Sequence, residues 1–436
     1  MANNLQILIL AAGKGTRMNS DTPKVLHKVA GSTMIDHVIQ KAKLLNPSKI
    51  TIMINKSLLV LKKQYPNIQL LIQEPQLGTG HAVQIFRKKN TSKNINLLVL
   101  YGDNPLIDID DLKKIKSQLK ISDVVIMGFH TQHNSSYGII IEKNNQVEEI
   151  VEFKEASLQQ RKITTCNSGI IALSSKALQL VSQIKNNNTK KEFYLTDIVK
   201  LAKKYNHKIK VITAKEEKTA LGVNDMNELG MAEKIMQDQY RKKAMKGGVR
   251  LVAPETVFLS KDSVFGKNVI IEPHVIIGPK VKIGNDVVIR SFSHLENCII
   301  KNKVIIGPYA RIRPGTVLED NTKVGNFVEI KNSKINKNSK INHLSYIGDT
   351  NMGQNVNIGA GTITCNYDGV KKSKTNIKNG SFVGSNSSLV APVTLGSNSI
   401  IGAGSVITKN VEDNTLALTR SEQKKVKLSM RKKRTK

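Results

Sequence analysis

Beyond residue 258 a large apolar side chain returns every six residues, and this period constrains the fold more than any other feature of the chain. A period of six matches neither an α-helix nor a simple alternating strand. It is typical of a parallel β-helix, in which each hexapeptide forms one short strand and one turn around a narrow core. Gly and Asn between the apolar positions accept the positive φ that such turns need. We expect few aromatic residues here, because a thin prism has little room for large rings. The repeating positions are Leu259, Phe265, Ile271, Ile277, Ile283, Ile289, Leu295, then Ile306, Ile312, Leu318, Val324, Ile330, and then Ile377, Val383, Leu389, Leu395, Ile401 and Ile407.

Before residue 225 the chain alternates between apolar runs and helical patterns. Such alternation predicts an α/β layer fold, Rossmann-like, with a mainly parallel sheet. Amphipathic helices are expected over Met34–Leu45 and Gly80–Phe86. The expected strands are Leu5–Ala12, Ile50–Ile54, Ile68–Ile72, Leu97–Tyr101 and Val124–Gly128.

One long helix is expected between these two parts. Asp225 with Glu228 fits a capping box, and Gly247-Gly248 supplies a stop. About 21 helical residues would span roughly 30 Å. The 436 residues therefore divide into an α/β domain (1–224), a linker helix (225–248) and a β-helix domain (249–436) that ends in a basic tail. The apolar positions with helical spacing are Leu229, Ala232, Ile235, Met236 and Tyr240.

The chain is strongly basic, with a formal net charge of +33. Such a charge is typical of nucleic-acid-binding proteins. The excess is diffuse, however, at +14 for residues 1–228 and +19 for residues 229–436, and only residues 424–436 form a real cluster. A diffuse excess of lysine is usually a solvated surface, so we expect no nucleic-acid partner.

Neither membrane insertion nor secretion is expected. No apolar run approaches the roughly 18 residues that a membrane helix needs. The first apolar run leads into Gly13-Lys14-Gly15-Thr16-Arg17 and not into a small-residue cleavage site. Cys166, Cys298 and Cys365 are odd in number and far apart, which favours a reducing cytoplasm over a disulfide framework.

A glycine-rich turn follows the first expected strand, from Leu10 to Met18, with Pro23-Lys24 soon after. It is neither a dinucleotide fingerprint, since Met18 stands where a third glycine belongs, nor a Walker loop. Backbone N–H groups there can cradle phosphates while Lys14, Arg17 and Lys24 neutralise them. Taken alone, the turn is equally consistent with a plain β-turn.

Asp103 follows Gly102 at the carboxyl end of another expected strand. A carboxylate beside the same crevice is well placed to hold Mg²⁺, which would offset the charge of nucleotide phosphates. The competing interpretation is an Asp that only caps a turn or a helix.

The regular repeat is interrupted where polar residues cluster, and an interruption of a solenoid is a candidate site. His343 lies in one such cluster and can act as a general base. A single His in a turn is more often structural. The clusters are Arg311–Pro314, Gly325–Lys331, Asn342–Tyr346 and Asn355–Gly361, followed by a loop from Thr364 to Lys374.

These motifs resemble the sugar-nucleotide pyrophosphorylases. With the hexapeptide half, their order resembles the bacterial bifunctional N-acetylglucosamine-1-phosphate uridyltransferase/glucosamine-1-phosphate N-acetyltransferase family over nearly the whole chain. The departures are mild: Phe193 replaces a frequent Tyr, and Ser168 a commoner Thr. The matching residues are Gly13–Met18 with Pro23-Lys24, Gln73, Gln76–Ala82, Tyr101–Asp103, Tyr137-Gly138, Ile150–Glu152, Asn167–Gly169, Tyr194–Asp197 and Gly222–Asn224.

The resemblance implies a UTP site in the first domain, where the sugar 1-phosphate attacks the α-phosphorus and releases pyrophosphate. Asp103 and Asn224 would hold Mg²⁺, and the catalytic cations Arg17 and Lys24 would bind phosphates. Gly138, Glu152 and Asn167 would hold the amino sugar of N-acetylglucosamine 1-phosphate. The uracil and ribose would contact Leu10, Ala11, Ala12, Gly13, Gln73, Gly78 and Thr79, and Tyr101 and Gly102 complete the set.

The resemblance also implies an acetyltransferase in a left-handed β-helix. His343 would deprotonate the amine of glucosamine 1-phosphate. Arg313 and Lys331 would grip the phosphate, and Tyr346 and Asn357 would orient the sugar, with Glu329 and Lys372 in support. Family members form homotrimers with sites between neighbouring prisms. Acetyl-CoA would contact Ala360, Asn366, Tyr367, Ser385, Ala403 and Arg420.

Other interpretations stay open on the sequence alone. The chain could be a single-activity nucleotidyltransferase with a structural β-helix, or a basic nucleic-acid-binding protein, for which no recognition motif is present. Its tail could be a solvated end, a region that steers acetyl-CoA phosphates, or a nucleic-acid or membrane contact.

Overall fold

The computed structural model describes residues 4–92, 94–132, 137–143, 146–188 and 190–426. These residues form two compact units, one that ends at Met236 and one that begins at Gln237. The division falls inside helix α8 (Met226–Lys246), so each unit includes one half of that helix.

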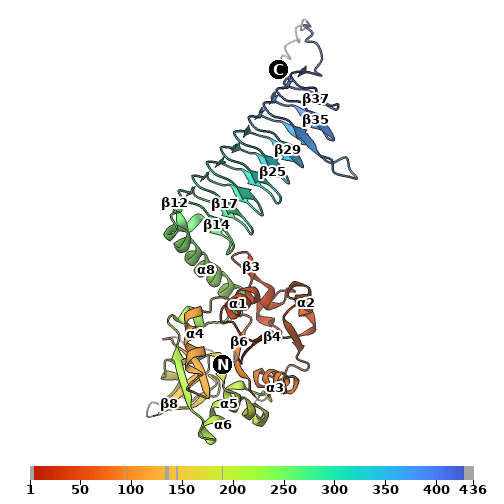
Figure 1. Ribbon diagram of the computed structural model, residues 1–436. Helices are drawn as coiled ribbons and strands as arrows, with labels where there is room; N and C mark the ends of the chain where they lie inside the picture. Colours follow the sequence, from red (N-terminus) through yellow and green to blue (C-terminus); the bar gives the residue numbers. More distant parts are fainter. Residues whose placement is uncertain (1–3, 93, 133–136, 144–145, 189, 427–436) are drawn as a thin grey trace, which may run out of the picture. The chain divides into compact units, whose positions relative to one another are not determined.

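A mixed, mainly parallel sheet forms the centre of the first unit (Figure 1). Its order is β11-β7-β10-β6-β1-β4-β5, β10 runs antiparallel to both neighbours, and β8 pairs with β10 and β9. The five expected strands are present, although β1 ends at Leu10 and not at Ala12 because the chain turns there into the glycines. The strands are β1 (Leu5–Leu10), β4 (Lys49–Ile54), β5 (Gln69–Ile72), β6 (Asn96–Tyr101), β7 (Val124–His130), β8 (Ile139–Lys143), β9 (Gln146–Val151), β10 (Thr165–Leu173) and β11 (Ile209–Thr213).

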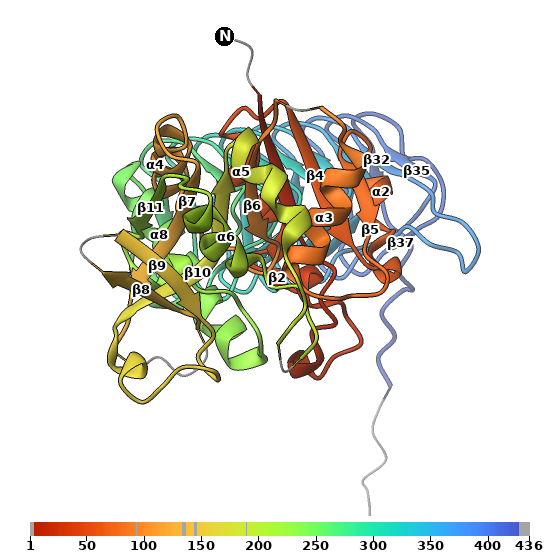
Figure 2. The same cartoon turned by 90° about the horizontal axis from the view of Figure 1, so that it is seen from below.

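Helices cover both faces of this sheet. Ile7 and Ile9 of β1 pack in one core with helices α1, α2 and α4, whereas Leu8 packs in the opposite core with α3, α5 and α6 (Figure 2). This alternation follows from the two-residue period of a strand. The helices are α1 (Met34–Lys43), α2 (Leu61–Gln64), α3 (Thr79–Lys89), α4 (Ile109–Gln118), α5 (Ser175–Gln179), α6 (Ile198–Lys204) and α7 (Glu217–Ala220), and β2 (Lys28–Val29) with β3 (Ser32–Thr33) forms a separate hairpin.

Helix α8 has the 21 residues that the pattern predicted. Asp225 Oδ1 accepts a hydrogen bond of 2.8 Å from the backbone N–H of Glu228, as in a capping box. In a capping box the Glu side chain accepts in return from the backbone N–H of the N-cap residue, here Asp225. In this helix the Glu228 carboxylate instead accepts from the backbone N–H of Asn224, one residue before the cap, at 2.6 Å. The cap therefore also fixes Asn224.

The second unit is a three-faced parallel β-helix. Its first face holds β12 (Arg250–Leu251), β15 (Ile270–Ile271), β18 (Val288–Ile289), β21 (Ile305–Ile306), β24 (Lys323–Asn326), β27 (Lys340–His343), β30 (Asn357–Ile358), β33 (Phe382–Val383), β36 (Ile400–Ile401) and β38 (Leu416–Ala417). The second face holds β13 (Phe258–Leu259), β16 (Ile276–Ile277), β19 (His294–Leu295), β22 (Arg311–Ile312), β25 (Glu329–Lys331), β28 (Tyr346–Gly348), β31 (Ile363–Cys365), β34 (Ser388–Val390) and β37 (Val406–Ile407). The third face holds β14 (Val264–Phe265), β17 (Lys282–Ile283), β20 (Ile299–Ile300), β23 (Val317–Leu318), β26 (Lys334–Ile335), β29 (Thr350–Met352), β32 (Thr375–Ile377) and β35 (Val393–Leu395).

The six-residue register correctly predicted the core of this prism. The repeating positions are buried in one continuous cluster, and Phe265 alone among them is only partly buried. The expected positive φ occurs at turn residues such as Asn268, Asn321 and Asn386. Most coils therefore contain short left-handed turns, a conformation that Asn tolerates.

The expectation that the β-helix has few aromatic residues was wrong outside the core. His274, Phe292, Tyr309 and Phe327 stack in successive coils at the corner between the first and second faces, with ring centroids 4.8–5.1 Å apart. All four have positive φ, and the three rings from Phe292 to Phe327 are about half exposed. We call this set the aromatic ladder. Stacking offsets part of the backbone strain that bulky residues have there.

Two candidate active sites

A cavity of about 1120 Å³ opens at the carboxyl ends of β1 and β6. Most of the nucleotide-site residues expected from the sequence line it; Gly102 and Arg17 do not. Sequence reasoning missed two cations of the lining, Lys154 and Lys190, because they lie in loops without a motif. The expected residues that line the cavity are Leu10, Ala11, Ala12, Gly13, Lys24, Gln73, Gly78, Thr79, Tyr101, Asp103, Gly138, Glu152, Asn167 and Asn224.

The glycine turn brings Lys24 to this cavity. Gly15 has a φ of 64°, and a Cβ there would lie 2.6 Å from the Cβ of Lys24. Only glycine allows this approach, since an added side chain would both strain the turn and displace Lys24. Gly102, although outside the lining, packs closely between Ala11 and Val25 and so holds β6 against β1.

Four polar side chains meet beside the cavity, and three of them, Lys24, Asp103 and Asn224, belong to its lining. Lys24 Nζ contacts the Asp103 carboxylate and donates to Asn224 Oδ1 at 2.9 Å. Arg17 donates to the same Asn224 oxygen at 3.0 Å. The structure therefore joins the two expected phosphate cations to the two expected metal ligands.

This cluster fits a divalent cation that binds together with a phosphate. Asp103 Oδ1 is buried and has no hydrogen-bond partner among the described residues, so it is free to be a ligand. Asn224 adds a second hard oxygen next to it. The described residues contain no group of three or more His, Cys, Asp or Glu that could hold a metal alone. Phosphate and water oxygens would complete the shell, as Mg²⁺ usually requires.

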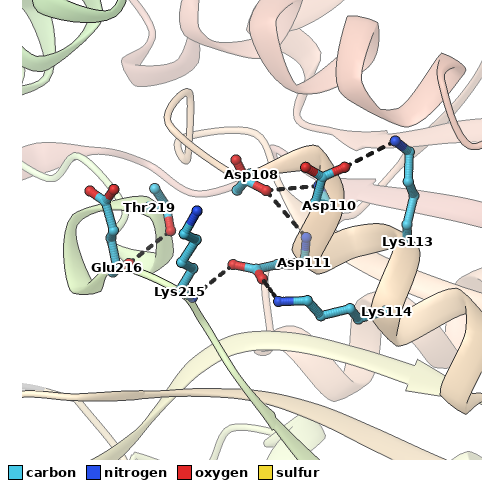
Figure 3. Close-up of polar contacts among 8 residues, drawn as sticks. All are labelled: Asp108, Asp110, Asp111, Lys113, Lys114, Lys215, Glu216 and Thr219. Atoms are coloured by element: carbon cyan, nitrogen blue, oxygen red, sulfur yellow. Dashed lines mark hydrogen bonds and ion pairs between the residues drawn. The ribbon is translucent and has the colours of Figure 1, made fainter.

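Hydrogen bonds farther from the cavity hold the segment that leads to Asn224. Figure 3 shows Asp111, at the start of α4, accepting from the backbone N–H of Lys215 at 3.0 Å and from Lys114 Nζ at 2.8 Å. Val223 N–H then donates to the Asp103 carbonyl oxygen at 2.8 Å. The carboxylates of Figure 3 are structural, since none of them lines the cavity.

Other residues of the cavity lining are suited to a sugar. Asn167 N–H donates to the Gly138 carbonyl at 2.7 Å, which links two of the expected sugar contacts. Burial raises the pKa of Glu152. Burial also raises the pKa of Tyr101, whose ring fills the space where a side chain at Gly169 would lie. Polar groups in a partly dry cavity are what hydroxyl recognition needs.

In the β-helix, two corners carry most of the expected acetyltransferase residues. His343 ends β27, and Ala360, Ser385 and Ala403 follow the next three strands of the first face, toward the corner that also bears the aromatic ladder. Backbone hydrogen bonds join Asn386 to Ala360 and Gly404 to Ser385. Arg420 donates to the Ala403 carbonyl at 3.2 Å, at the end of this row.

The corner between the second and third faces gathers cations. Arg313 donates to Glu329 at 2.6 Å, and Lys331 lies one coil farther on. A loop projects from the prism after β31 (Figure 1). Lys372 in this loop lowers the pKa of Lys331. Two ammonium groups that repel each other form a site for a multiply charged anion.

Asp349 also lies at this corner, and sequence reasoning missed it. It accepts from Asn332 Nδ2 at 2.5 Å and from Asn366 Nδ2. Burial raises the pKa of Asp349, but hydrogen bonds from these amides and the nearby lysine charges outweigh burial and lower it. The carboxylate therefore fixes Asn366, an expected acetyl-CoA contact.

The expected residues do not all share one face of the prism. Asn357 lies on the first face, Tyr346, Glu329 and Lys331 lie on the second, and Arg313 and Asn366 lie beyond its far edge. Tyr367 is in the projecting loop, where its hydroxyl donates to Gly369 O at 2.6 Å.

Comparisons with known proteins agree with both halves of the chain. Residues 7–168 match the MobA-like NTP transferase domain, and residues 262–297, 297–332 and 374–409 match the bacterial transferase hexapeptide. These matches confirm the predicted fold class, a nucleotidyltransferase domain followed by a left-handed β-helix of hexapeptide repeats. In the described part of the chain, no helix has both the length and the apolar character to cross a bilayer.

Relatives match along nearly the whole chain, and each is named "Bifunctional protein GlmU". The Ruegeria sp. (strain TM1040) protein is 43% identical over 96% of this chain and 94% of its own length. The Zymomonas mobilis protein is 43% identical over 95% and 94%. The Wolbachia pipientis wMel protein is 44% identical over 95% and 97%. The chain therefore belongs to the bifunctional GlmU family, enzymes that join a nucleotidyltransferase domain to a hexapeptide-repeat transferase domain.

Proposed function

We propose that the first unit transfers UMP from UTP to N-acetylglucosamine 1-phosphate and releases pyrophosphate. The observation that carries this is the unpartnered buried Asp103 oxygen beside Lys24 and Asn224, in a cavity large enough for a nucleotide and a sugar. Asp103 and Asn224 would hold Mg²⁺. When bound, Mg²⁺ would offset the negative charge of the nucleotide phosphates.

The residues of the chain contribute mainly position and charge. Lys24 and Arg17 would leave Asn224 and Asp103 to bind the phosphates. The sugar-phosphate oxygen then attacks the α-phosphorus in line, the new P–O bond forms, the α–β bridging bond breaks, and pyrophosphate takes the electron pair. Glu152, Asn167 and Gly138 would hold the sugar, and Gln73, Gly78 and Thr79 the base and ribose. Positioning and charge neutralisation supply most of the catalysis in such reactions.

The β-helix would carry out acetyl transfer from acetyl-CoA to glucosamine 1-phosphate. Arg313, Lys331 and Lys372 would bind the phosphate, which the mutual approach of the two lysines supports. His343 would take a proton from the amine as its nitrogen attacks the thioester carbonyl. The C–S bond then breaks, and the CoA thiolate leaves and collects the proton.

Acetyl transfer would come first and uridylyl transfer second, so that the product is UDP-N-acetylglucosamine. Such a product feeds the synthesis of peptidoglycan, lipopolysaccharide and lipid A. The three free cysteines fit the cytoplasm as the place of reaction. We do not assign a nucleic-acid partner, because the excess of basic residues is spread over both halves of the chain.

A homotrimer would complete the acetyltransferase site. This is supported by the distribution of the expected contacts over two faces and two corners of one prism. The aromatic ladder adds exposed apolar area beside them. Light scattering of the purified chain should give three times the 48.2 kDa mass of one chain.

The full reaction tests the proposal. Purified protein with glucosamine 1-phosphate, acetyl-CoA, UTP and Mg²⁺ should yield UDP-N-acetylglucosamine, identified by mass spectrometry. Omission of acetyl-CoA should stop product formation, and N-acetylglucosamine 1-phosphate should restore it. If that sugar is used but no amino-sugar phosphate ever releases CoA, the chain is a single-activity nucleotidyltransferase with a structural β-helix.

A further inference from the structure

The first face of the prism has longer strands at His343 than along most of its length. Strands β24 (Lys323–Asn326) and β27 (Lys340–His343) are four residues long, whereas most strands of the first face have two. The longer ladder brings Asn326 opposite His343, one coil apart. A Cβ at Gly325 would collide with the carbonyl oxygen of Asn342, so only glycine lets the two coils come this close.

The two side chains are joined by a hydrogen bond. His343 Nδ1 lies 2.9 Å from Asn326 Oδ1, and the Asn326 side chain is less exposed than the ring. An amide oxygen can only accept, so Nδ1 must carry the hydrogen. In a neutral imidazole the lone pair is then on Nε2. Ser345 Oγ donates to the His343 carbonyl at 2.7 Å and holds the backbone on the other side.

We propose that Asn326 is a positioning residue that fixes His343 in the Nδ1–H tautomer and thereby directs a basic Nε2 at the acceptor amine. This inference rests on the acetyl transfer proposed above. As the amine nitrogen forms its bond to the acetyl carbon, its proton moves to Nε2, and the imidazolium that results keeps its Nδ1–H bond to Asn326. The proton then leaves with the CoA thiolate when the C–S bond breaks. The same device, an acceptor on one ring nitrogen that sets the role of the other, operates in other His-based sites.

Among the described residues, no carboxylate takes the place of Asn326 beside the His343 ring. Glu329, on the adjacent strand of the second face, is bonded to Arg313 at 2.6 Å and faces Arg311 at 3.8 Å. The charged residues on the two strands themselves are Lys323 and Lys340, which pair with each other three residues before Asn326 and His343. A neutral amide orients the ring without adding charge beside an anionic substrate.

The tautomer can be measured directly on the ligand-free full-length protein. The ¹⁵N shifts of the His343 ring, assigned with the His343→Gln variant, should give Nδ1–H in the wild type. Asn326→Ala removes the acceptor, and the ring should move toward the Nε2–H form that water favours. Asn326→Asp keeps an acceptor and should retain Nδ1–H. Asn351→Ala is the matched control, since Asn351 makes a similar exposed contact to Asn376 on the third face.

Kinetics separate positioning from substrate binding. Asn326→Ala should lower kcat for CoA release roughly 10- to 100-fold, a part of what a general base contributes. The KM for glucosamine 1-phosphate should change less than about twofold, because Arg313 and Lys331 are untouched. Asn326→Asp should recover most of kcat, and Asn351→Ala should match the wild type.

Either of two results would overturn the inference: Nε2–H on His343 in the wild type, or a wild-type kcat in Asn326→Ala when His343→Ala is inactive. Failure of the proposed function looks different. In that case the ring shows Nδ1–H, yet the wild type releases no CoA from any amino-sugar phosphate.

Discussion

At the residue scale, Lys24 is the side chain that connects the polar groups of the nucleotide site. It contacts both Asp103 and Asn224, and Gly15 exists in a conformation that leaves room for it. Lys24→Met should lower pyrophosphate release roughly 100- to 1000-fold, because a cation aimed at developing phosphate charge is lost. CoA release should stay unchanged. The control is Lys28→Met at an exposed position of β2, and a similar loss in that variant would refute a specific role for Lys24.

The lysine pair of the second unit predicts a pH effect. Lys372 lowers the pKa of Lys331, so Lys331 loses its charge at a lower pH than an ordinary lysine does. As pH rises through that pKa, a phosphate contact is lost and the KM for glucosamine 1-phosphate should rise. In Lys372→Gln the pKa of Lys331 returns toward its usual value, and the rise in KM should begin at higher pH. The measurement is KM against pH for both proteins; curves that begin to rise at the same pH would contradict the coupling.

The sequence predicted some residues of the two sites and missed others. The expected cations and metal ligands of the first unit lie in one cluster, although Asp103 alone of the four follows the carboxyl end of a sheet strand. Asn326 and Asp349 were not assigned roles, although their partners His343 and Asn366 were. Each acts across one coil, 17 residues away, and that distance depends on the exact coil length, which a six-residue period does not give.

At the element scale, the six-residue period predicts burial position by position. Ile283 of β17 lies on this register and is buried, whereas its neighbour Lys282 is exposed. Ile283→Ala should lower the free energy of unfolding by about 2–5 kcal/mol through lost burial and a cavity. Lys282→Ala should change it by less than about 0.5 kcal/mol. Guanidinium denaturation followed by circular dichroism gives both values, and equal effects would mean that the register is wrong.

The aromatic ladder adds a stabilising element outside the core. The Tyr309 ring stacks on Phe292 at 4.8 Å and on Phe327 at 5.1 Å. Tyr309→Ala should cost about 1–3 kcal/mol, because two ring pairs are lost. Tyr309→Phe keeps both pairs and should be nearly neutral in the same denaturation experiment. If the two variants are equally stable, stacking contributes nothing.

The elements differ in how well the sequence predicted them. Core positions and turns followed from the period, since inward side chains and left-handed turns recur in most coils. The aromatic ladder did not, because His274, Phe292, Tyr309 and Phe327 occupy turn positions outside the aliphatic register. Half of the α8 cap was predicted, and the Glu228 contact to Asn224 was missed because it reaches one residue past the usual partner.

At the scale of the whole molecule, the fold was predictable because each half has its own period and motifs. The net charge of +33 is explained only for some of the basic residues. Arg17, Lys24, Arg313, Lys331 and Lys372 gather at the two sites, where polyanions would bind. Arg420 ends the proposed acetyl-CoA row. No contact explains most of the other lysines, and residues 427–436 of the basic tail lie outside the described part of the chain.

The central claim is that two independent active sites act in sequence in one chain. The direct test is a coupled assay that scores CoA release and pyrophosphate release separately in Asp103→Ala and His343→Ala. Asp103→Ala should lose only pyrophosphate release, because its carboxylate lies in the nucleotide cavity. His343→Ala should lose only CoA release. If each substitution abolished both activities in protein that circular dichroism shows to be folded, the two-site account would be wrong.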